Sequence, residues 1–327
     1  MTAFLKKIKR AFDAELLRSR FASESFRAFL HDWRRFRWHA GAMHLDRREA
    51  ALAEIVMGYH VLEKGLTMPH RRLGFGRPAA LNLARLVEAF EKKHGTDPQA
   101  VHAAAVLRAY RQLHAAEQMP RLDAFLAARP AVPAAVEPHV RREDYFAAKD
   151  APFPAFAASR HCVRHFAGPV PRETIERAIA VAVTAPSACN RQHARVHVVD
   201  SPALRDRLFA MQGGTRGFGQ DADKVLVVAA DLSAVRWAWE RHDAFTNGGI
   251  FALNLCYALH HEGVAACILH WSVPPETDAA ARKLLALPAS EEIVLLVACG
   301  APPDEFDVPA SPRRDPASIT TWHGDAT

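Results

Sequence analysis

Apolar residues recur at helical spacing through the first 128 residues, and this pattern predicts a mostly α-helical region. One expected helix face is formed by Leu52, Ile55, Val56, Tyr59 and Leu62. A second face, which ends near Gly95, is formed by Leu81, Leu83, Leu86, Val87 and Phe90, and a third pattern covers residues 101–113. Between the first two lies HVLEKGLTMPHRRLGFGRP (residues 60–78), whose glycines and prolines favour a loop. This loop is either a helix-to-helix connection or a loop that binds an anion or substrate.

Residues 129–158 have no sustained period. This segment contains Pro130, Pro133, Pro138, Pro152 and Pro154 among alanines and charged residues. Because proline fixes φ and removes a backbone donor, we expect an extended linker here.

From Ser159 onward, predicted helices and strands alternate. Strands are expected at 193–200, 224–231, 264–271 and 292–300, and helices at 172–184, 202–211, 234–262 and 276–287. The sequence Asn247-Gly248-Gly249 is expected to interrupt the third of these helices. The chain is therefore divided into a helical region (1–128), a Pro/Ala-rich linker (129–158) and an α+β domain (159–327).

The formal net charge of +6 is unevenly placed. Residues 1–38 carry ten Lys or Arg and four Asp or Glu, so the whole excess lies in this segment. A basic protein often binds nucleic acid, but the main body of this chain is charge-balanced and needs no polyanionic partner. We therefore expect no nucleic-acid partner.

The basic segment also has an apolar side. Phe4, Leu5, Ile8, Phe12 and Leu16 recur at helical spacing, and further aromatic residues follow at Phe29, Trp33, Phe36 and Trp38. A basic amphipathic helix with such aromatics can lie on an anionic membrane surface. The interpretation we favour is a helix that packs on its own domain with a solvated basic face, and RNA binding is the third and least favoured option.

Composition narrows the class of protein. Half of the residues are hydrophobic and 24% are charged, as in globular proteins. The sequence has no apolar run of membrane-spanning length, and its N-terminus lacks the pattern of a secretory signal. Its five cysteines are widely spaced, which argues against a disulfide framework and favours the reducing cytoplasm.

A zinc site and a dinucleotide-binding loop are both suggested by residue type, but the residues and elements around them do not fit either site. The histidine pairs His161/His165 and His193/His197 lack the adjacent Glu of a helical zinc hydrolase, and the sequence has no Cys-x-x-Cys. We therefore predict no metal site. The glycine-rich segment GGTRGFG (213–219) precedes a strand, whereas a dinucleotide-binding fingerprint follows one.

Three other segments carry chemistry that suits a phosphorylated heterocycle. In SRHCVRHF (159–166), Ser159 could cap a short helix whose N-terminus, with Arg160 and Arg164, would bind a phosphate. The alternative for this segment alone is an ordinary solvated helix start. APSACNRQ (185–192) offers a hydroxyl and two amides in a turn. SPRRDP (311–316) adds cations near the C-terminus.

Together these segments resemble the nitroreductase-like family of flavin oxidoreductases. The first is similar to the family's S-R-R-S-x-R-x-F opening and the second to its A-P-S-x-x-N-x-Q-P-W turn, while residues 248–255 and 263–271 are similar to its central helix and the following strand. The resemblance covers about residues 156–323. It implies an α+β sandwich with a central antiparallel sheet flanked by helices, which here follows an α-helical N-terminal region, and FMN bound at a homodimer interface.

The resemblance also implies which residues bind the cofactor. The stretch that holds the FMN phosphate and ribityl chain corresponds to Arg160, His161, Cys162 and Arg164, with Arg314 as the C-terminal phosphate cation. The turn that reaches FMN from the other subunit corresponds to Pro186, Ser187, Ala188 and Asn190. The segment along the isoalloxazine ring corresponds to Leu269, His270 and Trp271. No separate catalytic acid or base is assigned.

The implied activity is transfer of hydride from NADH or NADPH through flavin N5 to an unidentified small-molecule acceptor. The family's Pro-Trp is His193-Ala194 here, Cys162 stands where Ser is usual, and Trp271 replaces a residue that is often Gly. The alternative is therefore a catalytically weak binding or scaffolding protein that retains the flavin fold. The segment HVLEKGLTMPHRRLGFG resembles a helical extension in nitroreductase-like proteins of polysaccharide biosynthesis. We expect a cytoplasmic protein, with peripheral contact to the inner face of the membrane through residues 1–38 as an alternative.

Overall fold

The computed structural model describes residues 3–130 and 136–324, with side chains described for residues 13–130 and 139–324. Contacts divide the chain into two compact units. The sheet unit contains Gly168–Ala301 and the N-terminal segment through Met43, and the helical unit contains His44–Ala167 and the C-terminal segment from Pro302. Each unit combines segments that are distant in sequence. The predicted boundaries 1–128, 129–158 and 159–327 instead divide the chain into consecutive segments of different composition. Those boundaries stay a prediction.

The sheet unit is built on a four-stranded antiparallel sheet in the order β2-β3-β5-β4. Its strands are β2 (Ala194–Val199), β3 (Lys224–Asp231), β4 (Ala265–His270) and β5 (Glu291–Gly300). The predicted strand at 224–231 is therefore confirmed, as are the other three within a few residues. The predicted α+β class with a central antiparallel sheet is confirmed.

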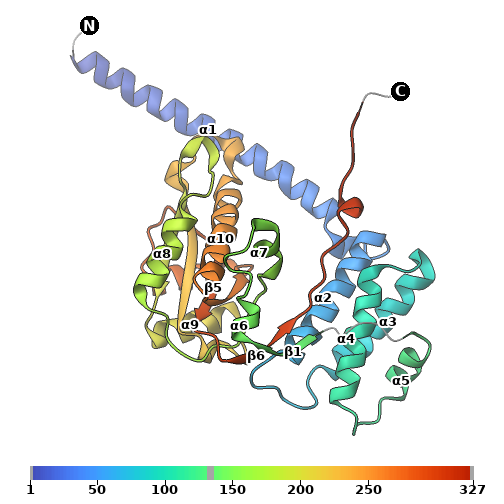
Figure 1. Ribbon diagram of the computed structural model, residues 1–327. Helices are drawn as coiled ribbons and strands as arrows, with labels where there is room; N and C mark the ends of the chain where they lie inside the picture. The colour runs from blue at the N-terminus through green and yellow to red at the C-terminus, as the bar shows by residue number, and fades with distance from the viewer. Residues whose placement is uncertain (1–2, 131–135, 325–327) are drawn as a thin grey trace. The chain divides into compact units, whose positions relative to one another are not determined.

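Helices flank this sheet because alternate strand residues point to opposite faces. The helices of the unit are α1 (Ala3–His39), α8 (Arg172–Ala182), α9 (Pro202–Gln212), α10 (Asp243–His261) and α11 (Pro275–Leu284). Figure 1 labels β5 of this sheet together with the helices α8, α9 and α10 of the same unit. One core packs α8 and α10 against Leu226 and Val228 of β3 and Val297 and Cys299 of β5. Burial raises the pKa of the Cys299 thiol to about 12, so this cysteine is an inert core residue.

The predicted interruption at Asn247-Gly248-Gly249 is wrong, because α10 runs through it without a break. A Cβ at Gly248 would lie 2.6 Å from Cγ2 of Val294 on β5. The glycine therefore allows close packing of the helix on the sheet and does not end the helix. The preceding residues, expected to be helical from 234, form instead the short 3-10 turns η4 (Leu232–Ala234) and η5 (Ala238–Glu240).

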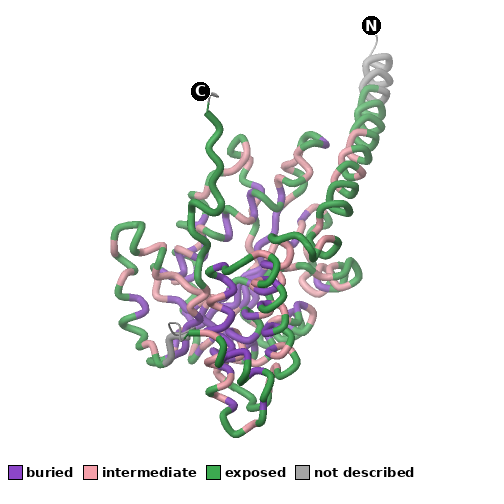
Figure 2. Tube along the Cα trace, turned by 90° about the vertical axis from the view of Figure 1, so that its right-hand side faces the viewer, coloured by how far each residue is buried: buried purple, intermediate pink, exposed green. Residues whose placement is uncertain are grey.

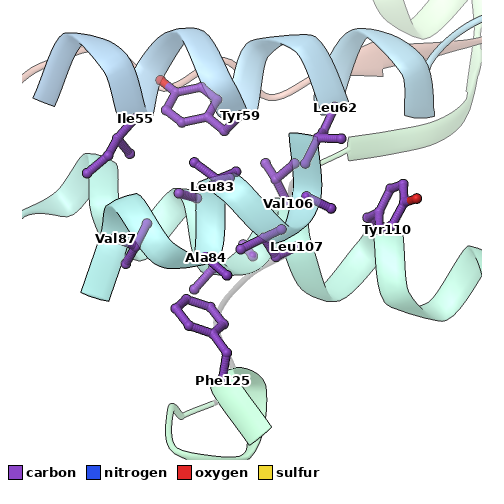
Figure 3. Close-up of a cluster of buried hydrophobic side chains, with 14 of the residues drawn as sticks. Ile55, Tyr59, Leu62, Leu83, Ala84, Val87, Val106, Leu107, Tyr110 and Phe125 are labelled. Carbon is purple, nitrogen blue, oxygen red and sulfur yellow. The ribbon is translucent and has the colours of Figure 1, made fainter. Parts of the chain in front are cut away.

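The helical unit contains a four-helix core. Its helices are α2 (Arg48–Leu66), α3 (Arg77–His94), α4 (Pro98–Leu113) and α5 (Pro120–Ala127). The predicted α2 face places Leu52, Ile55, Tyr59 and Leu62 inside this core, where they meet residues from the other three helices (Figure 3). The predicted loop at 60–78 begins later than expected, since α2 continues through Gly65 to Leu66.

The expected extended linker at 129–158 contains regular structure. The structure has β1 (Val136–Arg141), α6 (Arg142–Tyr145) and α7 (Phe153–Ser159) there. The strand β1 pairs antiparallel with β6 (Glu305–Pro309) in a two-stranded sheet. The register of this pairing shifts between Glu137 and Val140, so Pro138 lies at an irregularity of the ladder, where proline is tolerated.

The helix α1 is the longest in the chain and its described side chains are largely exposed (Figures 1 and 2). Phe4, Leu5, Ile8 and Phe12, on which part of the predicted amphipathic face depends, have side chains outside the described part. Among the described residues, none of the helices combines the length and the hydropathy that a membrane span requires.

Candidate functional site

A cavity of about 630 Å³ lies in the helical unit. Its wall combines α2, the extended segment after α7 and the C-terminal segment that follows β6. It is lined by Ala53, Val56, Met57, Tyr59, His60, Gln99, Arg160, His161, Cys162, Arg164, Pro309, Ser311, Pro312, Arg313 and Arg314. All five residues predicted to hold the FMN phosphate and ribityl chain line this one cavity, and its volume is typical of cofactor pockets.

The segment after Ser159 has a different backbone from the one expected. Ser159 is the last residue of α7, and residues 160–167 form no helix. The predicted helix N-terminus is therefore wrong. The buried Tyr145 hydroxyl accepts a bond from the His161 N–H (2.9 Å) and donates to the His161 carbonyl (3.0 Å), so these groups are not free for helical bonding. Burial raises the pKa of Tyr145 to about 12, which keeps this hydroxyl protonated.

Arg164 is the most distinctive side chain of the cavity. It is only 7% exposed, and its Nε and Nη1 atoms are buried without a hydrogen-bond partner among the described residues. The Nε of Arg160 is also buried and unpartnered. A guanidinium that is buried without a counterion is costly, so these donors suit an anion that enters the cavity.

Arg313 and Arg314 complete the set of cations. Both side chains are exposed at the cavity wall, and Nη1 of Arg314 is 2.8 Å from Oε2 of Glu49. Arg314 thus lines the same cavity as Arg160 and Arg164, and so does Arg313, which the sequence analysis did not assign to the site.

Glu63 fixes the C-terminal segment beside the cavity. This carboxylate is fully buried and accepts hydrogen bonds from the Ser311 N–H (2.9 Å), the Ser311 hydroxyl (2.8 Å) and Nε2 of His102 (3.1 Å). Burial acts to raise its pKa, but the hydrogen bonds from His102 and Ser311 outweigh burial and hold the pKa below its usual value. The sequence contained a signal for this residue, because Glu63 lies in the HVLEKGL segment singled out as an anion or substrate loop. Its partners were not predictable from that motif.

The α2 wall of the cavity is less polar. It presents Ala53, Val56 and Met57, with His60 at the edge. Desolvation at this wall and the positive charge of Arg164 lower the pKa of His60, so its imidazole is neutral near neutral pH. One wall thus carries cations and the other carries apolar groups, which suits an amphipathic, negatively charged ligand.

The second group of predicted residues lies in the sheet unit, in a strained turn. Ser187 precedes the 3-10 turn η2 (Ala188–Asn190), in which Cys189 and Asn190 have φ of 50° and 54°, and Gln192 has φ of 51°. Non-glycine residues rarely adopt this left-handed conformation, and clusters of it occur mainly at functional sites.

Contacts from the rest of the unit hold this turn in place. The buried Asn247 accepts a bond from the Ala188 N–H (2.8 Å), and the Ser187 hydroxyl accepts one from the Gln192 N–H (3.0 Å). Arg191 pairs with both oxygens of Glu240, at 2.8 and 3.0 Å. The role of Asn247 was missed from the sequence, where Asn-Gly-Gly indicated a helix break.

Leu269, His270 and Trp271 lie at the end of β4. The Leu269 side chain is 7% exposed, so it packs in the core, whereas His270 is exposed. Trp271 donates from Nε1 to Oδ1 of Asp278 on α11 (2.8 Å), which fixes its ring. The assignment of these residues, and of the turn, to a flavin stays a prediction.

Comparison with known proteins supports the resemblance in one segment. The model of the Nitroreductase family matches residues 157–215. The match confirms the predicted resemblance there, and it includes both the Arg160–Arg164 stretch and the 186–190 turn. A comparison with curated proteins finds no match.

Several solved structures are distantly similar to about half of the chain. A nitroreductase-like protein from Streptococcus mutans is 20% identical, with a TM-score of 0.45, over 53% of this chain and 98% of its own. An FMN-dependent nitroreductase from Clostridium difficile R20291 is 18% identical, with a TM-score of 0.42, over 53% of this chain and 98% of its own. The NADPH:FMN oxidoreductase of Vibrio harveyi, in complex with NAD+, is 18% identical, with a TM-score of 0.46, over 53% of this chain and 77% of its own.

Proposed function

We propose that this protein is an FMN-dependent oxidoreductase that oxidises NADH or NADPH and reduces a small-molecule acceptor. The observation that carries the proposal is Arg164, a buried guanidinium with unpartnered donors facing a cavity of cofactor size. The match of residues 157–215 to the Nitroreductase family supports FMN as the anionic ligand.

Arg164 and Arg160 would hold the FMN phosphate, with Arg313 and Arg314, which line the same cavity, as further cations. A guanidinium offers a planar fork of donors that fits two phosphate oxygens, and each charge-assisted bond is shorter and stronger than a neutral one. His161 and Cys162 line the same stretch of cavity and would contact the ribityl chain. The apolar α2 wall would exclude water from this part of the ligand.

Bound FMN supplies the redox chemistry, since its ring system accepts a hydride from a nicotinamide and passes electrons on. This chain contributes binding, orientation and positive charge near the ligand. We assign no side chain as a catalytic acid or base.

The same proposal includes a homodimer. In it, Pro186, Ser187, Ala188 and Asn190 would contact the flavin of the other subunit, and Leu269, His270 and Trp271 would lie along the isoalloxazine ring. The strained conformation of the turn supports a binding role, because its left-handed residues are held by Asn247 and by internal bonds at a conformational cost. A cytoplasmic location also remains a proposal.

Flavin titration of the purified apoprotein tests the phosphate site. Arg164→Met should weaken FMN binding about 10- to 150-fold, the equivalent of one lost charge-assisted hydrogen-bonding group. Arg164→Lys keeps the positive charge but loses the planar pair of guanidinium donors, so its FMN affinity should lie between those of Arg164→Met and the wild type. The matched control is Arg121→Met, an exposed arginine of α5 outside the cavity, which should bind FMN normally.

Anaerobic reduction tests the activity. Addition of NADH or NADPH to the FMN-loaded protein should bleach its yellow colour, and a suitable acceptor should restore it. A protein that takes up no FMN contradicts the proposal. A yellow protein that neither nicotinamide bleaches points instead to the alternative, a binding or scaffolding protein with the flavin fold.

A further inference from the structure

The helix α1 carries a continuous stripe of exposed aromatic side chains. Phe26, Phe29, Trp33 and Phe36 are spaced so that they share one face of the helix, and they are 68, 54, 53 and 74% exposed. A stripe of large apolar side chains on a water-facing helix is unusual for a monomeric protein surface and marks an interaction site.

A second aromatic group lies where α1 meets the rest of the sheet unit. The 3-10 turn η5 contacts α1, and the link is Asp32, which pairs with Arg241 and, at 2.9 Å, with Nε2 of His242. Beside this link the rings of Trp237 and Trp239 stack with a centroid distance of 5.1 Å, and these tryptophans are 39% and 59% exposed. The junction therefore adds amphipathic indole rings to the aromatic surface.

Two arginines lie against this aromatic surface, and three more follow another side of the helix. Arg37 lies over the Trp33 ring, with Cζ 5.4 Å from its centroid, and Arg236 lies 4.7 Å from the centroid of Trp237. Along the helix, Arg20, Arg27 and Arg34 recur every seven residues on another side. The carboxylate of Asp32, which lies in the same stretch, is neutralised by its pairing with Arg241.

We infer that the aromatic stripe of α1, together with Trp237 and Trp239, docks this protein onto an anionic phospholipid surface. Aromatic side chains would enter the headgroup boundary, where indole rings are favoured, and the arginines would contact lipid phosphates and carboxylates. The positive charge of this surface favours a lipid bilayer over a second copy of this chain as its binding partner. A second copy of this chain would bring a second set of arginines against the first, whereas an anionic bilayer is complementary to them. This inference is independent of FMN binding.

Co-sedimentation of the full chain with lipid vesicles tests the inference. Vesicles of phosphatidylcholine with about one third phosphatidylserine should bind the protein, pure phosphatidylcholine should bind it much more weakly, and added salt should release it. Trp33→Ser/Phe36→Ser should reduce binding to the anionic vesicles by about tenfold or more. Both side chains are exposed, so unfolding of the double variant should match that of the wild type.

The matched control lies outside this helix. Ile319→Ser/Trp322→Ser removes two side chains of the C-terminal segment that are 68% and 91% exposed, and it should leave binding unchanged. Arg35→Glu/Arg37→Glu tests the charge separately and should abolish the preference for phosphatidylserine. Absence of binding to anionic vesicles overturns the inference, as does equal loss in the control. It is also overturned if the aromatic variant loses self-association in solution and not vesicle binding, since a second copy would then cover this face.

Discussion

Replacement of Glu63 by glutamine removes one buried negative charge and keeps the volume of the side chain. Three donors point at this carboxylate, from the Ser311 backbone, the Ser311 hydroxyl and His102. The amide keeps one oxygen for the backbone N–H, and its NH2 can donate to the hydroxyl after that group rotates. Each bond then changes from charged to neutral, at a cost of about 1 kcal/mol, so we expect Glu63→Gln to lower the free energy of unfolding by about 2–3 kcal/mol.

Glu63→Gln should also lower the affinity of the cavity for its ligand. Ser311 is the anchor of the segment that carries Arg313 and Arg314, and its own φ of 38° is strained. A looser anchor leaves these cations less well placed, so FMN affinity should fall as well. Urea unfolding of the apoprotein measures the first effect without any flavin, and FMN titration measures the second.

The pH dependence provides a further check on Glu63. Its pKa is lower in the folded protein than the usual 4.5, so its contribution to stability is present above that value and is lost as the pH falls below it. Glu63→Gln should flatten this part of the stability profile, whereas Glu88→Gln, an exposed glutamate on α3, should not. Wild-type stability and flavin affinity in Glu63→Gln would refute the reasoning.

Two other substitutions test the packing around the site and the sheet. Tyr145→Phe removes the hydroxyl that bonds both backbone groups of His161, and it should cost about 1–3 kcal/mol in urea unfolding and weaken FMN binding; unchanged unfolding would contradict this. Gly248→Ala should lower the free energy of unfolding, measured by thermal unfolding, by about 1–3 kcal/mol, because the new Cβ would overlap Val294. Gly249→Ala should raise it by about 0.5–1 kcal/mol, because a Cβ at that position meets no other atom. Equal effects of the two glycine substitutions would show that the contact with Val294 is unimportant.

Helices and strands were easier to predict from the sequence than the tertiary contacts between them. KVLVVAAD is apolar between its terminal Lys224 and Asp231, so a buried strand was predictable there, and the α2 face followed from its period. The failures at 160–166 and 247–249 have a common cause. In both places a tertiary contact, Tyr145 in one and Val294 in the other, decides the backbone, and no local pattern reveals it.

The candidate site shows the same division. Arg160, Arg164 and Arg314 were singled out because they fall in motifs, and the structure shows that they line one cavity. Their assignment to a phosphate stays a prediction. Glu63 acts through Ser311, which is distant in sequence, and the role of Arg313 depends on that anchor. A motif gives the residue types of a site, but the hydrogen bonds that place them come from the fold.

The pairing of β1 with β6, which are far apart in the sequence, affects how the helical unit folds during translation. One edge of its small sheet, β1, leaves the ribosome long before its partner β6, and the whole of the sheet unit's Gly168–Ala301 is made in between. The arginine cavity therefore cannot close during translation until residues 309–314 have left the ribosome. Until then β1 has an unpaired edge and Arg164 lacks part of its surroundings, so a nascent chain that stalls before residue 309 would expose an unfinished pocket to chaperones and proteases.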